Sequence, residues 1–595
     1  MSSNNFIRGG SDIDPLTLAV VSNGLVAAAE EMGLVLRKTS FSEAVREGED
    51  CSASIFDAEG NMVAQGNFAP SHLGTSPTAV RAVLRRYARK EMRPGDAFLL
   101  NDPSMNSGHM PDIFSISPIF YSDEVVGFTV VTAHHVDVGG AAPGSQAIIG
   151  IIDIHQEGIR ILPCRHFDAG EPNEEVLGLI GGNVRVPDQV IGDIKGQYNA
   201  NLVGAAKVVR LIEHFGLDTY RRCAQEILER SEAAMLSAIA DIPDGSYTFV
   251  EHLDDCGPGT NPIRIQLRVT IEGERLVADY AGSSPATRSG VNCYFPFARA
   301  YTYHALKCVI APQLPQNSGG MRAVEVTAPA GSFCNAQYPT ASGGRAIIAR
   351  HIVDAVLAAM AQAVPERSQA ASSQLCNSTI GGVDAATGKP FVYYDLTFGS
   401  TGARAHKDGC DGLVAGFNTG NIPIEVHEAI WPVRVECFGF LPDTAGPGKY
   451  RGGLAVRRDV RNLADIGLVT NLHDRHEMPA FGLFGGEPGS KGRIILNPGT
   501  PGERDLHSKS ILDVAKGDVV SFQTCAGGGW GDPLEREAEA VRRDVMEGWV
   551  TREAAREKYG VVLSDEFEVL VEQTASQRSA LAEQRSASGG SHHGI

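Results

Sequence analysis

The first element that the hydrophobic pattern predicts is an amphipathic helix over residues 15–38. Apolar residues recur there every three or four positions, from Leu16 to Leu36, and Pro15 stands at a favoured first-turn position. Similar spacing predicts further helices at 76–92, 202–240, 345–364 and 535–558. These helices leave long stretches of the chain for β-structure.

Residues 112–138 have the pattern of an antiparallel hairpin. Phe114 and Ile116 alternate with serines, residues 121–124 have turn composition, and 125–132 are rich in β-branched residues. Other strands are expected near 51–63, at 246–281 and in a glycine-rich region from about 390 to 531. Because regular βαβ spacing is missing, we predict an α+β fold of several subdomains, rich in antiparallel strands, with an N-terminal metal-binding part.

Composition along the chain suggests five segments. They are an N-terminal metal-binding domain at 13–245, a central α/β domain at 246–390, a glycine-rich β domain at 391–533, a helical segment at 534–570 and a low-complexity, disordered tail at 571–595. The glycines of Gly446 to Gly453 and of Gly527 to Gly531 are expected to form tight turns with positive φ.

Two clusters of candidate metal ligands flank the predicted hairpin. His109 and Asp112 stand just before its first strand, and a second cluster after its second strand holds His134, His135 and Asp137. Because a hairpin brings the start of one strand beside the end of the other, the clusters should be neighbours. An odd-numbered turn places Asp112 opposite His134, whereas an even-numbered turn places it opposite Ala133, on the face of His135. The sequence leaves both registers open.

Two imidazoles with one or two carboxylates make a mixed nitrogen and oxygen donor set. Such a set suits Mn, Fe or Zn, and a bound divalent ion polarises a carbonyl and lowers the pKa of its water toward 7. The acidic run before the strand near residue 51 adds further candidates: Glu47, Glu49 and Asp50. His72, in the sequence SHLG, is a weaker candidate, since a structural histidine with satisfied hydrogen bonds is more common than a ligand.

Charge and motifs exclude several classes of function. A net charge of -19 and a pI near 5.4 disfavour nucleic-acid and anionic-membrane partners, which need clustered Lys and Arg. The eleven cysteines form no CxxC pair, and the N-terminus has no apolar leader core, so we expect a cytoplasmic protein. There is no GxxxxGK[ST] loop for ATP and no GxSxG nucleophile elbow.

Longer motifs resemble those of one known family. The chain resembles the hydantoinase B/oxoprolinase family from about residue 13 to 565, in DPLTLAVVSNGLVAAAEEMGLVLRKTSFSEAVREGEDCSASIFDAEGNMVAQ, NDPSMNSGHMPDI, VGFTVVTAHHVDVGG, NVRVPDQVIGDIKGQ, PDTAGPGKYRGGLAVRRD and AGGGWGDPLEREAEAVRRDV. The family is similar to metal-bearing subunits of acetone carboxylase-type enzymes, to caprolactamase B subunits and to the second half of 5-oxoprolinase.

The resemblance implies an enzyme that works as a pair of subunits. An A-type partner would bind ATP at an actin/hexokinase-like site and phosphorylate a carbonyl or amide oxygen, while this B-type chain supplies the divalent metal. We expect a heterotetramer or larger complex. Carried over by motif, the metal ligands are Glu47, His109, Asp112 and His134, with His135 and Asp137 as catalytic residues that orient them.

The chain departs from the family pattern in two places. The family's K-E-R-x-D-F-S is Arg46 to Ser52 here, with glycine and cysteine at positions 48 and 51, so the acidic ligand is either Glu47 or Asp50. The family's TMNN-like motif is Leu375 to Ser378 here, so substrate contacts there should differ.

The reaction that the resemblance implies is hydrolysis of a C–N bond in a cyclic amide, such as a hydantoin, 5-oxoproline or another lactam. The alternative is a subunit of an ATP-dependent ketone carboxylase of the acetone or acetophenone type, which is disfavoured because carboxylase subunits of this kind are typically longer than 595 residues. A third possibility is a non-catalytic scaffold for the ATPase partner.

Overall fold

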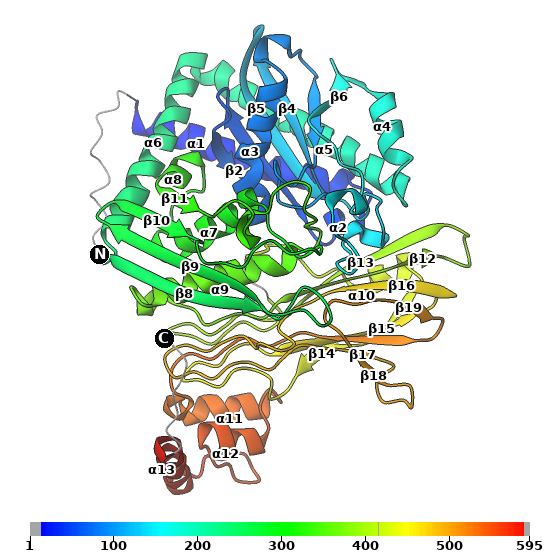
Figure 1. The fold of residues 1–595 in the computed structure, drawn as a ribbon. Helices are drawn as coiled ribbons and strands as arrows, with labels where there is room; N and C mark the ends of the chain where they lie inside the picture. The colour runs from blue at the N-terminus through cyan, green and yellow to red at the C-terminus, as the bar shows by residue number, and fades with distance from the viewer. Residues whose placement is uncertain (1–12, 414–415, 588–595) are drawn as a thin grey trace.

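The computed structural model describes residues 13–413 and 416–587, which form an upper α+β lobe, a lower β lobe and a C-terminal group of helices (Figure 1). The helices of the upper lobe are α1 (Pro15–Thr39), α2 (Glu43–Arg46), α3 (Pro70–Arg86), α4 (Glu174–Gly181), α5 (Pro187–Phe215), α6 (Leu217–Ala240), α7 (Phe295–Ile310), α8 (Ser318–Arg322) and α9 (Ala346–Ala361). This mixed architecture with antiparallel sheets confirms the predicted α+β class.

The N-terminal part is built on a seven-stranded antiparallel sheet of order β2-β1-β5-β4-β3-β6-β7. Its strands are β1 (Cys51–Asp57), β2 (Met62–Gln65), β3 (Ala97–Leu100), β4 (Asp112–Tyr121), β5 (Glu124–His134), β6 (Cys164–Asp168) and β7 (Glu171–Pro172). The predicted hairpin is β4 and β5, at the centre of this sheet. Central strands are held by neighbours on both sides, so the residues at their ends are fixed in place.

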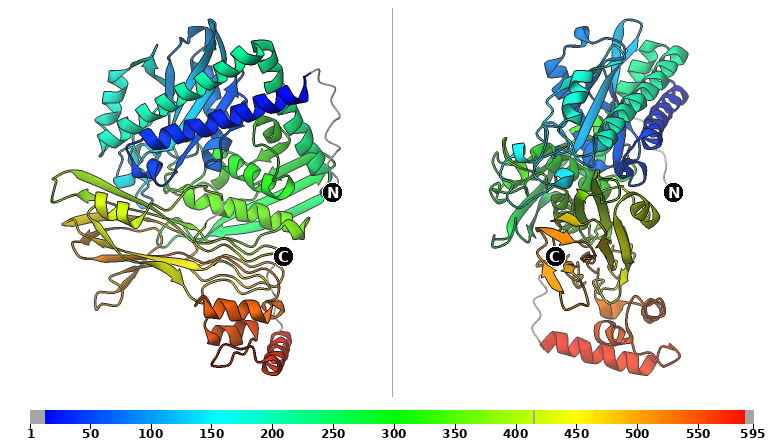
Figure 2. Two further views of the ribbon diagram at one scale, coloured as in Figure 1. Left: turned by 180° about the vertical axis from the view of Figure 1, so that it is seen from behind. Right: turned by 90° about the vertical axis from the view of Figure 1, so that its right-hand side faces the viewer.

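Helices cover both faces of this sheet. Side chains of α1, α5 and α6 pack with Ile55 and Val131 on one face, and side chains of α3 pack with Phe114 and Val130 on the other. Figure 2 shows α1 and α5 lying side by side across the first face. Alternation along β4 and β5 therefore directs Asp112 and His134 to the α3 face. This assignment decides which helix can contribute to the site.

Helix α1 has the length and apolar composition of a membrane-spanning helix. Core helices of globular proteins share these properties, and one face of α1, including Leu25 and Met32, is buried in the core beneath the sheet. Its N-terminus is capped by Asp14, whose carboxylate accepts the backbone N–H of Thr17 at 2.9 Å.

The expected helix at 202–240 is two helices. It starts earlier, at Pro187, and is divided at Gly216, whose φ of 82° is in the left-handed region that ends helices. The turn folds α6 back beside α5.

Three further sheets complete the chain. The central sheet, of order β11-β10-β9-β8, contains β8 (Gly245–Leu253), β9 (Ile263–Glu272), β10 (Arg275–Asp279) and β11 (Val324–Thr327), and only its β10 and β11 are parallel. The lower lobe has one sheet of β13 (Pro390–Phe398), β12 (Leu375–Val383), β16 (Ile466–Leu472) and β19 (Ile511–Ala515). The other contains β14 (Val433–Leu441), β15 (Ala455–Asn462), β20 (Val519–Gln523), β17 (Arg493–Leu496) and β18 (Arg504–Leu506), with α10 (Ile424–Ile430) beside it.

The glycine-rich segments pack backbone against backbone, which corrects the expectation of tight turns. Of Gly446 to Gly453 and Gly527 to Gly531, only Gly531 has a positive φ, 75°. A Cβ atom on Gly452 would lie 2.0 Å from the carbonyl oxygen of Gly527. These glycines are needed because neighbouring extended segments approach too closely for any side chain.

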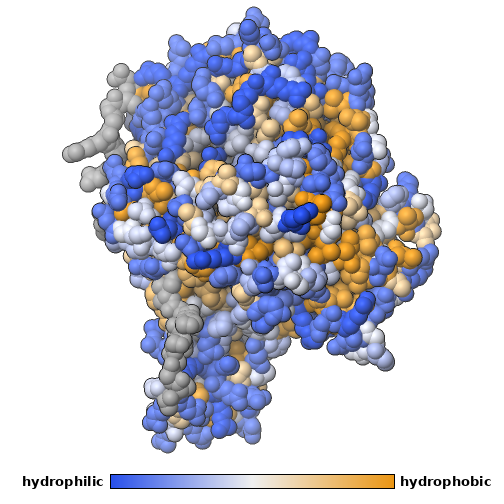
Figure 3. Space-filling view, viewed as in Figure 1, coloured by the Kyte–Doolittle hydropathy of each residue, from blue (hydrophilic) through white to orange (hydrophobic). Residues whose placement is uncertain are grey.

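The C-terminal helices are α11 (Ala538–Met546), α12 (Arg552–Tyr559) and α13 (Val571–Ala587). The expectation of a disordered tail from 571 is wrong for 571–587, and 588–595 lie outside the described residues. Ala, Glu, Gln and Arg favour helix, and Arg585 anchors α13 through Asp532 at 2.9 Å and Glu487 at 3.1 Å. Figure 3 shows a largely hydrophilic face whose apolar residues gather near the junction of the upper and lower lobes, on the right.

Candidate metal centre

The centre of the candidate site is a pair of residues that face each other across the β4–β5 hairpin. Asp112 begins β4, His134 ends β5, and the two stand directly opposite in the register. Tyr121 faces Glu124, so the turn between them has only two residues, an even number. A β-bulge between Ile119 and Phe120 inserts one residue and shifts the register by one. The pairing is therefore the one that an odd-numbered turn predicts.

Three candidate ligands converge at this strand end. The Nε2 atom of His109 lies 2.8 Å from Oδ1 of Asp112, and the Nδ1 atom of His134 lies 2.9 Å from the same oxygen. One donor atom from each of the three residues lies within 4.8 Å of the others. All three side chains are buried, so their donor atoms do not compete with bulk water. The two clusters that the sequence identified are brought together.

Two further side chains complete the cluster, His72 from α3 and Asp50 just before β1. The Nε2 atom of His72 lies 3.2 Å from Oδ2 of Asp112 and 4.0 Å from Oδ1 of Asp50. The Nδ1 atom of His72 lies 3.1 Å from Oγ of Ser52, which fixes the ring. Asp50 stands beside His134, whose backbone N–H donates to the Asp50 carbonyl at 3.0 Å. His72 and Asp50 both line the small cavity at the cluster, of about 30 Å³.

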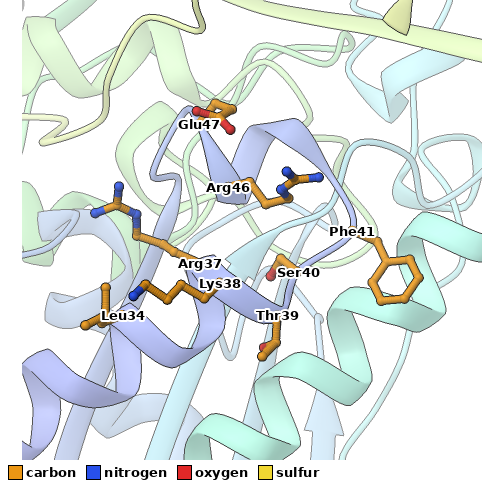
Figure 4. Close-up of a pocket in the computed structure, with 8 residues that line it drawn as sticks. All are labelled: Leu34, Arg37, Lys38, Thr39, Ser40, Phe41, Arg46 and Glu47. Carbon is orange, nitrogen blue, oxygen red and sulfur yellow. The ribbon is translucent and has the colours of Figure 1, made fainter. Parts of the chain in front are cut away.

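Glu47 does not line the cavity of this cluster. It caps the C-terminus of α2 and lines a separate pocket of about 660 Å³ with Arg37, Lys38 and Arg46, shown in Figure 4. Asp50, in contrast, does line the cavity of the cluster. Of the two acidic candidates, the structure brings Asp50 to His134.

His135 and Asp137 lie outside the cavity. His135 points to the opposite face of the sheet, where its Nε2 atom lies 3.2 Å from Oε1 of Gln197 on α5. The Asp137 carboxylate accepts a hydrogen bond from the Arg185 guanidinium at 2.8 Å and further hydrogen bonds from the backbone N–H groups of Gly139 and Gly144. Asp137 thereby orders the loop that leads to Gln146.

Side chains from the lower lobe hold the His134 ring. Tyr394 of β13 stacks on it with ring centroids 4.7 Å apart. The Nε2 atom of Gln146 lies 3.3 Å from Nε2 of His134, and Asn377 of β12 donates to Oε1 of Gln146 at 2.7 Å. Asn377 belongs to the Leu375–Ser378 segment that departs from the family pattern. The site thus includes residues from both lobes.

Sequence reasoning did not identify Arg345, the residue before α9. Its guanidinium contacts Oδ2 of Asp112, lies 2.9 Å from Nε2 of His109 and stacks on the Phe297 ring at 4.6 Å. Burial by itself would raise the pKa of Asp112, but His109 and Arg345 hold that pKa well below its usual range. Burial, reinforced by Arg345, lowers the pKa of His109 to about 3. The cluster therefore presents an ionised carboxylate and a neutral imidazole, the forms that bind metals.

The loop that carries Arg345 is fixed by Glu157. The Oε1 atom of Glu157 accepts the backbone N–H of Ser342 at 2.8 Å and that of Gly343. Burial raises the pKa of Glu157 to about 8 although these hydrogen bonds act in the opposite direction.

This pKa predicts a pH-dependent stability. Between the ordinary pKa of Glu157, 4.5, and about 8, only the folded protein keeps the proton on Glu157, so the contribution of this group to the free energy of unfolding should fall as pH rises, by about 1.4 kcal/mol per pH unit. The difference in unfolding free energy between the wild type and Glu157→Gln, measured from pH 4.5 to pH 9, should show this slope up to about pH 8, because the contributions of other groups cancel in the difference. Equal slopes would contradict the assignment.

The donor set fits a divalent transition metal. It combines imidazole nitrogens with carboxylate oxygens, as Mn, Fe and Zn sites do, and Nδ1 of His109 is a buried polar atom with no hydrogen-bond partner among the described residues. The cavity has room for an ion or a water molecule and little more. His109, Asp112 and His134 are therefore a candidate metal-binding triad.

Known proteins with this fold and sequence form one group. The chain matches the family model described as hydantoinase B/oxoprolinase over residues 14–533. It is 33% identical to the B-type subunit of a putative D-/L-hydantoinase from Pseudomonas sp. (strain NS671), covering 95% of this chain and 98% of the relative. It is 31% identical to the beta chain of the caprolactamase from Pseudomonas jessenii, over 96% of this chain and 99% of that one.

Solved structures agree. The crystal structure of ATP-dependent caprolactamase from Pseudomonas jessenii superposes with a TM-score of 0.89 at 29% identity, covering 96% of this chain and all of the other. The nucleotide-free structure of acetone carboxylase has the same fold, with a TM-score of 0.89 at 20% identity over 96% of this chain and 84% of that one. The family match, the relatives and the fold together show that this chain belongs to the hydantoinase B/oxoprolinase family.

Proposed function

We propose that the chain is the metal-bearing B-type subunit of an ATP-dependent cyclic amidohydrolase. The observation that carries this proposal is the buried cluster of His109, Asp112 and His134 in a chain that belongs to the hydantoinase B/oxoprolinase family. Relatives are named as hydantoinase and caprolactamase subunits, and a solved caprolactamase is described as ATP-dependent. These names support a cyclic amide as substrate and an A-type ATPase as partner, in a cytoplasmic heterotetramer or larger complex.

In this proposal, His109, Asp112 and His134 hold one divalent ion, and Asp50 is the acidic fourth ligand. Asp50 is preferred to Glu47 because it lines the cavity beside His134. When bound, the ion would polarise the amide carbonyl and lower the pKa of a water molecule. Mn, Fe and Zn all suit these donors.

The other residues of the site orient the metal ligands, and one of them, His72, can take up a proton. Ser52 holds His72 so that its Nε2 atom faces Asp50 and Asp112, where it can accept a proton and keep it between two carboxylates. Arg345 holds Asp112 ionised, and Gln146 and Tyr394 fix the plane of the His134 ring. Asp137 fixes the loop before Gln146, and His135 fixes the strand end from the opposite face. The closed cavity excludes bulk water, which strengthens each of these electrostatic contacts.

In this proposal the two subunits carry out different steps: the partner uses ATP, and this chain holds the metal. No phosphate-binding loop of the GxxxxGK[ST] type occurs in this chain. The subunit names of its relatives support an A-type partner, which would use ATP to phosphorylate the amide oxygen. Phosphorylation makes the ring carbon electrophilic. Water would add to that carbon, and the C–N bond would break as the nitrogen takes up a proton, which leaves an acyl phosphate. A second water would release phosphate and the ring-opened acid.

The test is to coexpress the chain with its neighbouring ATPase subunit. The complex is given ATP with hydantoin, 5-oxoproline, caprolactam, or a ketone plus bicarbonate, and the products are weighed by mass spectrometry. We expect ring opening with gain of one water on a cyclic amide, and almost no turnover by the lone chain. Gain of carbon dioxide on a ketone would assign the chain to the carboxylases instead. Unchanged activity after loss of all three ligands of the triad would make it a scaffold.

A further inference from the structure

A second pocket lies directly outside the metal cavity. It has a volume of about 640 Å³ and opens to solvent between α1, the segment after β2, and α7. Its lining is largely apolar and includes Val26, Phe68, Leu73 and Ile227. The side-chain amides of Asn23, Gln65 and Gln316 also line it. We call this pocket the antechamber.

The wall between the antechamber and the metal cavity is one residue thick. It has two halves, residues 68–73 and 416–419, and each half contributes some residues to one space and some to the other. The antechamber is lined by Phe68, Pro70, Leu73, Gly416 and Asn418. The metal cavity is lined by Ala69, Ser71, His72, Phe417 and Thr419.

The two spaces differ in what they can hold. Ligand pockets for small molecules have volumes of about 300–1,000 Å³, and the antechamber is in this range. The metal cavity, at about 30 Å³, is close to the size of a single water molecule. A cyclic amide therefore fits in the antechamber and enters the metal cavity only if the wall between them moves.

One half of the wall is rigidly packed. A Cβ atom on Gly33 would lie 2.0 Å from the Phe68 ring, and a Cβ atom on Gly66 would lie 2.2 Å from it, so the ring fills a notch between two glycines. Pro70 and Leu73 follow in the first turn of α3. This half is a poor candidate for movement, because close packing resists displacement.

The other half is held by hydrogen bonds and by one buried aromatic ring, Phe417. The side-chain N–H of Asn418 donates to the Asn67 carbonyl at 2.6 Å, and the backbone N–H of Gly420 donates to the Gly48 carbonyl at 2.9 Å. The Phe417 ring meets Tyr301 at a centroid distance of 6.3 Å, on the metal side. A shift of 416–419 breaks these hydrogen bonds, moves the Phe417 ring out of the core cluster that it shares with Tyr301, and joins the two spaces.

We infer that the antechamber is where the ring of the cyclic amide binds before it reaches the metal cavity, and that it enters past residues 416–419. The apolar edge of the ring would lie against Val26, Phe68 and Leu73, and the side-chain amides of Asn23 and Gln65 would meet its polar edge. Lys307, also in the lining, attracts a phosphoryl group on an activated amide. This inference rests on the proposed function for the identity of the ring.

Cys308 provides a chemical probe of the antechamber. It lines the pocket, and of the eleven cysteines, all of which are described, it is the exposed one. The residue is open to solvent on one side, but neighbouring protein atoms desolvate its sulfur and raise the pKa of the thiol, so labelling with a bulky maleimide is done at pH 8. The partly exposed Cys256, on the loop after β8, serves as an internal control.

The first measurement is protection. In the complex with the ATPase subunit, saturating hydantoin or caprolactam should slow maleimide labelling of Cys308 at least fivefold and leave labelling of Cys256 unchanged. The second is turnover: complete labelling of Cys308 should lower it at least tenfold without changing the bound metal. Cys308→Ser is the reference, and its turnover should be insensitive to the reagent.

A pair of variants on α1 tests the same pocket without chemical modification. Val26 and Val20 are 40% and 44% exposed, so neither position needs a small side chain for folding, but only Val26 lines the antechamber. Val26→Trp should lower kcat/KM for the cyclic amide at least tenfold with its metal content unchanged. Val20→Trp should match the wild type.

The outcomes separate this inference from the proposed function. Full turnover by a complex labelled at Cys308, or by Val26→Trp, overturns the antechamber and leaves the hydrolase intact. Protection of Cys308 by a ring that is never hydrolysed supports the antechamber and overturns the hydrolase. Absence of both protection and turnover overturns both.

Discussion

Asp112→Ala and His109→Ala are each expected to lower the content of bound divalent metal to below about a tenth of the wild-type value. Turnover should fall by on the order of 10²-fold or more, because loss of a ligand removes both metal affinity and the chemistry that the metal supplies. Asp112 is the centre of the cluster, within 3.2 Å of three imidazoles. Metal content is measured on purified complexes by elemental analysis. Equal metal content in the wild type and both variants would disprove the site.

The same measurement separates the two acidic candidates. We expect Asp50→Asn to lose metal because Asp50 lines the cavity, and Glu47→Gln to keep it because Glu47 lines the neighbouring pocket. Asp57→Asn is the matched control, an aspartate at the far end of β1 that caps the turn through Asn61. If metal is instead lost in Glu47→Gln alone, Glu47 is the acidic ligand, as the family motif implies.

Arg345→Met is expected to destabilise the metal-free protein by about 3–5 kcal/mol, because it leaves the buried carboxylate of Asp112 without its cation. Added Mn²⁺ should reduce this loss, since a bound cation replaces the missing positive charge. Denaturation midpoints with and without Mn²⁺ give both quantities.

Arg299→Met provides the control for this effect. Arg299 is partly buried on α7 and its guanidinium donates to the Thr78 hydroxyl at 3.1 Å, so its loss leaves no carboxylate unpaired. An Arg345→Met protein as stable as Arg299→Met, or one indifferent to metal, would show that Arg345 does not balance the charge of the site.

Much of the local structure could be predicted from the sequence. Helix α1 follows from its amphipathic repeat, and the β4–β5 hairpin follows from β-branched and aromatic residues on either side of a turn, although both faces of these strands are buried. Elements without such a repeat escape this kind of prediction: α13 has little amphipathic pattern, and its anchors, Asp532 and Glu487, are distant in sequence. The glycines near Gly452 wrongly predict turns, because close approach of two backbones leaves no local pattern.

The sequence by itself determined the family, the α+β class and the two histidine-containing segments that meet at one end of a hairpin. Only the tertiary structure decided the register: a bulge between Ile119 and Phe120 reverses the prediction of a two-residue turn and brings Asp112 opposite His134. It also brought His72 and Arg345 to the Asp112 carboxylate and placed Asp50 beside His72. Their positions depend on packing between elements far apart in the chain, and such packing has no period or spacing that can be read along the sequence.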